Sequence, residues 1–133
     1  ALHRYDGACA NIHGHSYRLE ATVVGPIATD TASPKCGMIM DFGDLKRVVQ
    51  TTVLDKVDHA LVLNSAMKND ENVQFFASLQ NGFGNIVWVD YQPTNENLLQ
   101  DFATRIQSEL PDGITLVKLR MYETNASFAE WTV

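Results

Sequence analysis

From Cys9 to Val24 the chain has the sequence Cys9-Ala-Asn-Ile-His13-Gly-His15-Ser-Tyr17-Arg-Leu19-Glu-Ala21-Thr-Val23-Val24. Apolar and polar residues alternate along it, with Tyr17, Leu19, Ala21 and Val23 on one face and Ser16, Arg18, Glu20 and Thr22 on the other. This alternation predicts a half-buried antiparallel strand over residues 13–24. Side chains two residues apart in a strand point the same way, so we expect His13 and His15 to direct both imidazoles at one point.

A third histidine indicates what the first two bind. The chain has four histidines, and His3, His13 and His15 all fall within the first fifteen residues. An isolated pair of histidines is more often an ordinary surface or core feature, but this clustering is hard to ascribe to chance. Three imidazoles form a common catalytic zinc site and leave a fourth position open for substrate or water. The cluster of His3, His13 and His15 is therefore a candidate Zn²⁺ site. Cys9 is either a fourth ligand or a nucleophile or base, and the spacing does not decide between these roles.

Composition limits the class of protein. The 133 residues are 45% hydrophobic, which predicts one domain over residues 1–133 with a substantial core. The net charge is −6 and no basic run occurs, which argues against a nucleic-acid or anionic-membrane partner. No apolar run approaches the ~18 residues of a membrane span, and no signal pattern opens the chain, so we expect a cytoplasmic protein. Two cysteines make no disulfide framework.

The rest of the first half predicts a hairpin and a helix. A polar connection over residues 25–35 is followed by an extended apolar run over 37–42, which indicates a second strand paired with the first across a long loop. Asp41 occupies the N-cap position of a helix that continues to about Val57. Its buried stripe is expected to contain Phe42, Leu45, Val48, Val49, Val53 and Val57.

The second half predicts a second helix and three strands. A polar segment over residues 65–84 contains a possible short helix at 72–79, and a short strand follows at 86–90. Thr94 caps a helix with the buried stripe Leu98, Leu99, Phe102, Ile106 and Leu110. Strands at 114–124 and 127–133 complete the chain, and in the first of them Val117, Leu119, Met121 and Glu123 share a face. The order of elements predicts an α+β domain with helices on one face of an antiparallel sheet.

These residues together give the chain a family resemblance over residues 1 to about 130. It resembles the 6-pyruvoyltetrahydropterin synthase and 6-carboxytetrahydropterin synthase family. The landmarks, in order, are Ala1-Leu-His3, Cys9-x3-His13-Gly-His15, Gly37-Met-Ile-Met-Asp-Phe42, Leu54-Asp-x2-Asp58-His59, Pro93-Thr94-x-Glu96-Asn97 and Glu123-Thr124. The resemblance implies the tunnelling fold, a four-stranded antiparallel sheet with two helices on one face that assembles into rings, with trimers stacked into homohexamers. The family's first strand precedes the Ala-x-His landmark, so we expect a preceding strand that this sequence lacks.

The same resemblance implies a role for each landmark residue. His3, His13 and His15 are implied to be zinc ligands, Cys9 the proton-abstracting thiolate, and Asp58 with His59 a proton relay. Glu123 is implied to anchor a pterin, since a carboxylate accepts two parallel hydrogen bonds from a 2-amino group and the adjacent ring N–H. Simpler interpretations exist: Glu123 as a solvated strand end, and His59 as a protonated residue that stabilises a helix C-terminus by about 0.3–1 kcal/mol. We expect Thr94 and Glu96 to act mainly as the cap and a first-turn residue of the second helix, and only secondarily as substrate contacts.

The implied reaction converts 7,8-dihydroneopterin triphosphate to 6-carboxy-5,6,7,8-tetrahydropterin, acetaldehyde and triphosphate, as in the queuosine pathway. The spacing C-x3-H-G-H resembles the carboxy-forming bacterial members, whereas animal 6-pyruvoyltetrahydropterin synthases resemble C-x5-H-G-H. The alternatives are the 6-pyruvoyl-forming reaction and an inactive pterin- or zinc-binding module. The resemblance also implies a site shared between subunits, with Cys9 and the zinc from one and Asp58, His59 and Glu123 from neighbours. Arg4, Arg18 and Lys46 are candidates for the triphosphate, although solvated surface charges are the simpler interpretation.

Overall fold

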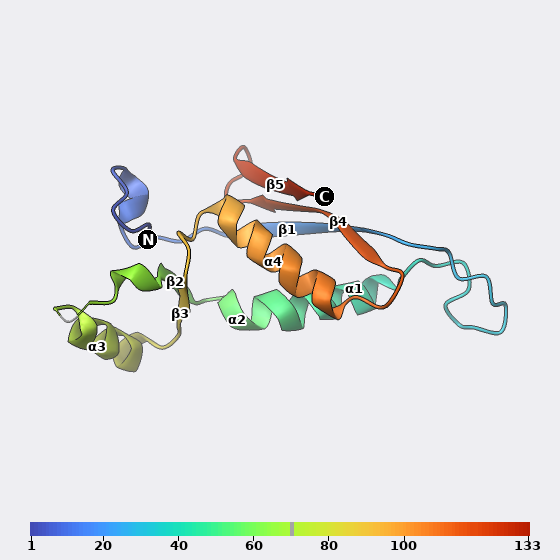
Figure 1. Cartoon of the computed structure of the whole chain (residues 1–133), viewed down its shortest axis with the longest axis horizontal. Helices are drawn as coiled ribbons and strands as arrows, with labels where there is room; N and C mark the ends of the chain where they lie inside the picture. Colours follow the sequence, from blue (N-terminus) through green and yellow to red (C-terminus); the bar gives the residue numbers. More distant parts are fainter. Residues whose placement is uncertain (70) are drawn as a thin grey trace.

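The computed structural model describes residues 1–69 and 71–133 of the chain. The described residues form five strands and four α-helices, which are labelled in Figure 1. In chain order these are β1 (Arg18–Val24), α1 (Phe42–Val49), α2 (Asp55–Val57), β2 (Leu61–Asn64), α3 (Val73–Phe83), β3 (Ile86–Val89), α4 (Asn95–Glu109), β4 (Thr115–Tyr122) and β5 (Phe128–Thr132). A π-helical segment, Gln50–Leu54, joins α1 to α2, and short 3₁₀ turns occur at Ala8–Ala10 and Ser65–Met67. None of the helices in the described ranges combines the length and the apolar character that crossing a membrane requires.

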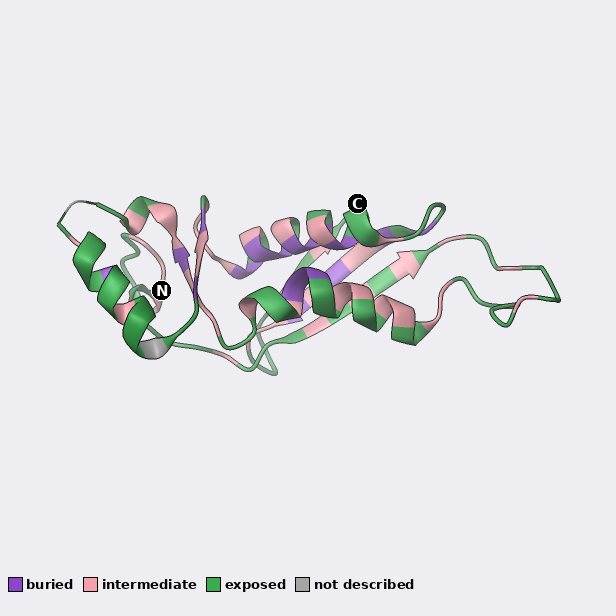
Figure 2. Cartoon of the chain, turned by 90° about the horizontal axis from the view of Figure 1, so that it is seen from below, coloured by how far each residue is buried: buried purple, intermediate pink, exposed green. Residues whose placement is uncertain are grey.

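The main sheet is antiparallel and has the strand order β1-β4-β5. Its pairing sets Arg18 of β1 opposite Tyr122 of β4, and Tyr122 opposite Phe128 of β5. Helix α4 and the α1–α2 segment pack on one face, which is where the core lies (Figures 1 and 2). This confirms an antiparallel sheet with its helices on one side. The core contains Val53, Leu98, Leu99, Phe102, Ala103, Ile106, Leu116, Leu119 and Met121.

The predicted four-stranded sheet differs from the sheet observed, because the described residues contribute three strands to it. The predicted strand at 37–42 is wrong. Only the base of the loop is paired there: Ala28 N–H donates to Met38 O at 2.9 Å, and Gly37 N–H donates to Ala28 O at 2.8 Å. Gly37 has φ 84, a left-handed conformation that turns the chain, and the helix cap at Asp41 follows within four residues. Too few extended residues remain to continue a ladder.

A second, smaller unit contains a strand pair that the sequence did not predict. Strands β2 and β3 form a parallel pair in which Leu61 lies opposite Ile86, and α3 is the crossover between them. The short helix predicted at 72–79 is therefore confirmed and is longer than expected, while Asp70 of the predicted loop lies outside the described residues. Leu63, Phe76 and Ile86 form the core of this unit. The N-terminal segment lies beside it, and Ala1 packs against its core (Figure 1).

Both predicted helix caps are present. The Asp41 carboxylate accepts from Gly43 N–H at 2.7 Å, and Thr94 Oγ1 accepts from Asn97 N–H at 3.3 Å. Phe42 does not belong to the buried stripe, since it is 90% exposed in the first turn of α1. Val117 is not in the inward row of β4 either: the register shifts between Thr22 and Val23, so that Leu116 takes the buried position.

Candidate functional site

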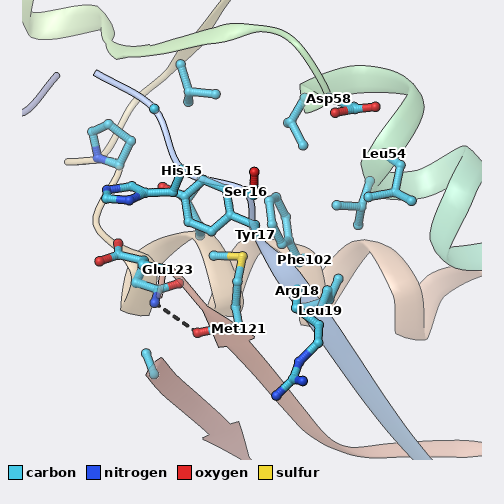
Figure 3. A pocket seen from close by; sticks show the side chains of 18 of the residues that line it. His15, Ser16, Tyr17, Arg18, Leu19, Leu54, Asp58, Phe102, Met121 and Glu123 are labelled. Atoms are coloured by element: carbon cyan, nitrogen blue, oxygen red, sulfur yellow. Dashed lines mark hydrogen bonds between the residues drawn. The ribbon is translucent and has the colours of Figure 1, made fainter. Parts of the chain in front are cut away.

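A cavity of 1320 Å³ opens between the approach to β1, the end of α2, the start of α4 and the end of β4. Figure 3 shows part of it, with His15, Tyr17, Asp58 and Glu123 labelled. Of the predicted site residues, all except His3 are among those that line it within the described chain: Cys9, His13, His15, Asp58, His59, Thr94 and Glu123. The fold therefore gathers residues from positions 9 to 123 around one space within a single chain.

His13 and His15 lie in the extended segment just before β1, which begins at Arg18 rather than at residue 13 as predicted. Their ring centroids are 5.1 Å apart at an interplanar angle of 87°. The His13 Nδ1–H group donates to Asn11 O at 2.8 Å, which leaves Nε2 of this ring free to accept or to ligate. The predicted juxtaposition of the two imidazoles is confirmed.

The zinc site itself stays a prediction. The donor chemistry suits Zn²⁺, since three imidazoles are a common ligand set. The geometry brings two of the three together: across the part of the chain that the structure describes, no three side chains of His, Cys, Asp or Glu are gathered as a metal site would require. His3 enters this region through its backbone, which is hydrogen-bonded to the side chain of Gln92.

Cys9 lies in the 3₁₀ turn Ala8–Ala10 and is partly buried. Its carbonyl accepts from Leu2 N–H at 2.7 Å, so the chain folds back on itself and brings Cys9 beside the residue that precedes His3. Arg4 follows with φ 54, an uncommon conformation for a non-glycine residue. The N-terminal segment is thus a closed loop that carries a thiol and an imidazole.

Asp58 and His59 form a contact pair at the end of α2. Nδ1 of His59 lies 3.0 Å from Oδ1 of Asp58, and both side chains are exposed. Asp58 N–H still donates to Leu54 O, whereas His59 has φ 56, so the helix ends in a left-handed residue. Figure 3 places Asp58 at this helix end, across the cavity from Glu123.

Glu123 follows directly after β4 and is partly buried. Its N–H donates to Ser127 O at 3.0 Å, which holds the residue in the turn before β5. Figure 3 shows its carboxylate on the same side of the cavity as His15. A carboxylate held in this way is available to accept hydrogen bonds from a ligand.

Tyr17 is a site residue that the sequence reasoning missed. Its ring lies 5.5 Å from that of His15 (Figure 3). Burial raises the pKa of Tyr17, and the nearby carboxylate of Glu123 raises it further. Its hydroxyl therefore keeps its proton at neutral pH and can donate a hydrogen bond. The sequence could have indicated it, because in the alternating stretch Tyr17 lies on the same face as His13 and His15.

Asn95 was also missed, and nothing in its sequence context pointed to it. It is 8% exposed at the start of α4 and lines the cavity. Its Nδ2 donates to Met121 O at 3.0 Å, and its buried Oδ1 has no hydrogen-bond partner among the described residues. The bond to a carbonyl oxygen determines which amide atom is the nitrogen. The start of α4 is thereby fastened to β4 two residues before Glu123.

The basic residues proposed for the triphosphate are not gathered. Arg18 lies with its guanidinium 4.0 Å from the centre of the Tyr122 ring and 3.4 Å from Glu20, and Figure 3 shows it pointing away from His15 and Glu123. Arg4 is exposed and is not among the residues that line the cavity, whereas Arg18 and Lys46 both are.

Comparison with known proteins gives a consistent family. Residues 1–132 match the protein family described as 6-pyruvoyl tetrahydropterin synthase. The chain is 30% identical to a 6-carboxy-5,6,7,8-tetrahydropterin synthase of Haemophilus influenzae over 98% of this chain and 88% of that protein. It is 32% identical to the human 6-pyruvoyl tetrahydrobiopterin synthase over 90% of this chain and 66% of that protein.

A solved structure shares the fold. An uncharacterized protein of Wolinella succinogenes superposes with a TM-score of 0.70 at 17% identity, covering 94% of this chain and 81% of that one. At this identity the likeness concerns the fold alone.

Proposed function

Because the chain belongs to the 6-pyruvoyl tetrahydropterin synthase family, we propose that it is an enzyme converting 7,8-dihydroneopterin triphosphate and water to 6-carboxy-5,6,7,8-tetrahydropterin, acetaldehyde and triphosphate. The observation that carries this proposal is that Cys9, His13, His15, Asp58, His59 and Glu123 line one cavity. The carboxy-forming choice is supported by the C-x3-H-G-H spacing and by the similarity to the Haemophilus influenzae protein across 98% of the chain.

The chain supplies an anchor for the heterocycle. The Glu123 carboxylate would accept N–H groups from the ring and its amino substituent, which fixes the plane and the orientation of the pterin. Tyr17 keeps its hydroxyl protonated beside this carboxylate and would donate to an acceptor of the ligand. Together they would direct the side chain of the substrate toward the histidines and the thiol.

Proton transfer would use Cys9 and the Asp58–His59 pair. Cys9 would remove a proton from the substrate side chain as a thiolate. Oδ1 of Asp58 lies 3.0 Å from Nδ1 of His59. A proton held on Nδ1 beside this carboxylate would leave Nε2 of that imidazole to exchange a proton with the substrate. We assign His3, His13 and His15 to a zinc ion, which when bound acts as a Lewis acid toward the hydroxyls of the substrate side chain.

Product analysis tests the reaction. Incubation of the purified protein with 7,8-dihydroneopterin triphosphate should yield 6-carboxytetrahydropterin and acetaldehyde, identified by mass spectrometry, and Cys9→Ala should yield neither. Formation of 6-pyruvoyltetrahydropterin without acetaldehyde would favour the alternative 6-pyruvoyl-forming reaction, which the 32% identity to the human protein supports. A protein that binds neopterin but catalyses neither the carboxy-forming nor the pyruvoyl-forming reaction would be an inactive binding module.

Metal content tests the zinc assignment with a matched control. The purified protein should contain about one zinc per chain, and His13→Ala and His15→Ala should lose it. His59→Ala removes the fourth histidine of the chain, the one not assigned to the metal, and should keep its zinc. If Cys9→Ala lost zinc, Cys9 would be a ligand instead of a base.

We also propose a homohexamer in which Cys9 of one subunit works with the Asp58–His59 pair of a neighbour, although a single chain already lines the cavity with all three residues. The order β1-β4-β5 leaves β1 and β5 as sheet edges in the described chain, and unpaired edges favour association. The mass in solution should be about six times 14.8 kDa. Mixing Cys9→Ala with His59→Ala should restore activity if the two residues meet across an interface, and a stable, active monomer would refute the shared site.

A further inference from the structure

The side chain of Gln92 makes two hydrogen bonds to the backbone of one residue far away in sequence. Its Oε1 accepts from His3 N–H at 2.9 Å, and its Nε2 donates to His3 O at 2.8 Å. Both polar groups of the His3 backbone are thus satisfied by a single amide, in the way that a neighbouring strand would satisfy them. Because the amide donates to a carbonyl and accepts from an N–H, only one orientation of it fits.

Gln92 is itself firmly placed. Its carbonyl accepts from Thr94 N–H at 2.8 Å and from Asn97 Nδ2 at 3.0 Å. Thr94 is the N-cap of α4, and Asn97 lies in the first turn of that helix. The backbone from which the Gln92 amide extends is therefore fixed by the start of the helix that forms one wall of the cavity.

Few other contacts fasten the N-terminal loop, which we define as residues 1–11. The bonds from Leu2 to Cys9, from Ala10 to Gly7 and from Asn11 to Ala8 are internal to it. In the described chain, the hydrogen bonds that join this loop to the body are the two with Gln92 and, at the end of the loop, the bond from His13 to Asn11. Only the Gln92 bonds hold the part that contains His3, supplemented by the packing of Ala1 on the small core. Losing the Gln92 amide should therefore release His3 and, through the Leu2–Cys9 bond, Cys9.

We propose that Gln92 is a positioning residue of the candidate site: its side-chain amide sets the place of His3 and Cys9 without touching the substrate. The inference rests on the proposed function, since His3 is a zinc ligand and Cys9 a base there. Residues that orient metal ligands through hydrogen bonds typically change metal affinity by about 10–100-fold when they are removed.

The experiment compares Gln92→Ala and Gln92→Glu with Gln100→Ala, a control that removes an exposed glutamine from α4. Amide hydrogen exchange of the zinc-free proteins should show His3 and Leu2 exchanging at least tenfold faster in Gln92→Ala, while the buried Ile106 stays unchanged. Zinc affinity, measured by competition with a chelator, should fall about 10–100-fold. Gln92→Glu keeps the acceptor and loses the donor. Its exchange rate at His3 and its zinc affinity should therefore lie between those of the wild type and those of Gln92→Ala.

Each outcome decides something different. Unchanged exchange at His3 in Gln92→Ala would overturn the inference, and so would faster exchange with wild-type zinc affinity in a protein that binds zinc. Uniformly faster exchange, including Ile106, would show a general loss of stability and would overturn it as well. A wild-type protein that binds no zinc would contradict the zinc assignment alone. In that case, faster exchange at Leu2 in Gln92→Ala, together with a lower kcat at unchanged KM, would still support the positioning of Cys9.

Discussion

Nδ1 of His59 lies 3.0 Å from Oδ1 of Asp58, although the two residues are adjacent in sequence and His59 has a left-handed backbone with φ 56. Neighbouring side chains in a helix diverge, so this contact requires the helix to end at that point. The end of α2 therefore converts a sequence dipeptide into a carboxylate–imidazole pair at the cavity.

Replacing the carboxylate tests whether this pair acts in proton transfer. Asp58→Asn keeps the shape of the side chain but no longer stabilises the proton on Nδ1, so kcat should fall about 10²-fold with little change in KM. Steady-state kinetics measure both. Asp112→Asn, which alters an exposed aspartate in the turn before β4, is the control and should keep wild-type kcat. If Asp58→Asn and Asp112→Asn had equal kcat values, Asp58 would have only a structural role at the end of α2.

Glu123 should contribute to affinity for the pterin ring. Glu123→Gln loses one acceptor and the negative charge, and hydrogen bonds to charged groups are worth about 1.5–3 kcal/mol. The dissociation constant of neopterin, followed by its fluorescence, should rise at least about tenfold. Glu109→Gln, an exposed change at the end of α4, should leave it unaltered. If both variants bound neopterin like the wild type, Glu123 would be only a solvated strand end.

Thr94 should be more important to stability than to binding. It caps α4 by accepting from Asn97 N–H, so Thr94→Ala should lower the free energy of unfolding by about 1 kcal/mol in urea titration. Thr94→Ser keeps the hydroxyl and should remain close to wild type. A raised KM in Thr94→Ala, with wild-type KM in Thr94→Ser, would add a substrate contact through the hydroxyl.

The Asp41 cap should make stability depend on pH in the acid range. The ammonium of Lys35, which donates to Asp41 at 2.8 Å, and the N–H of Gly43 hold the pKa of Asp41 below its usual value. A carboxyl whose pKa is lowered by folding stabilises the protein above its unfolded pKa, and this contribution is lost as the pH falls through the folded pKa. The wild type should therefore melt at a higher temperature than Asp41→Asn at pH 7. The difference should close as the pH falls through the folded-state pKa of Asp41, and a gap that persisted in stronger acid would show a cause other than charge.

Several features follow from the sequence alone because they depend on neighbours along the chain. The caps at Asp41 and Thr94 use bonds to residues two or three positions away, and the alternation over residues 13–24 brings His13 and His15 to one side. Adjacency also places Asp58 next to His59, and the end of α2 lets their side chains meet. Short-range geometry of this kind has few solutions, so residue type and spacing are sufficient to predict it.

Other features were decided by tertiary structure, because they join segments that no local rule pairs. The parallel pairing of Leu61–Asn64 with Ile86–Val89 depends on α3 closing the crossover, and the exclusion of Val117 from the inward row depends on the register with β1. The Gln92–His3 bonds span 89 positions. An amide side chain can serve any backbone within reach, so its partner is selected by the packing that brings the two segments together.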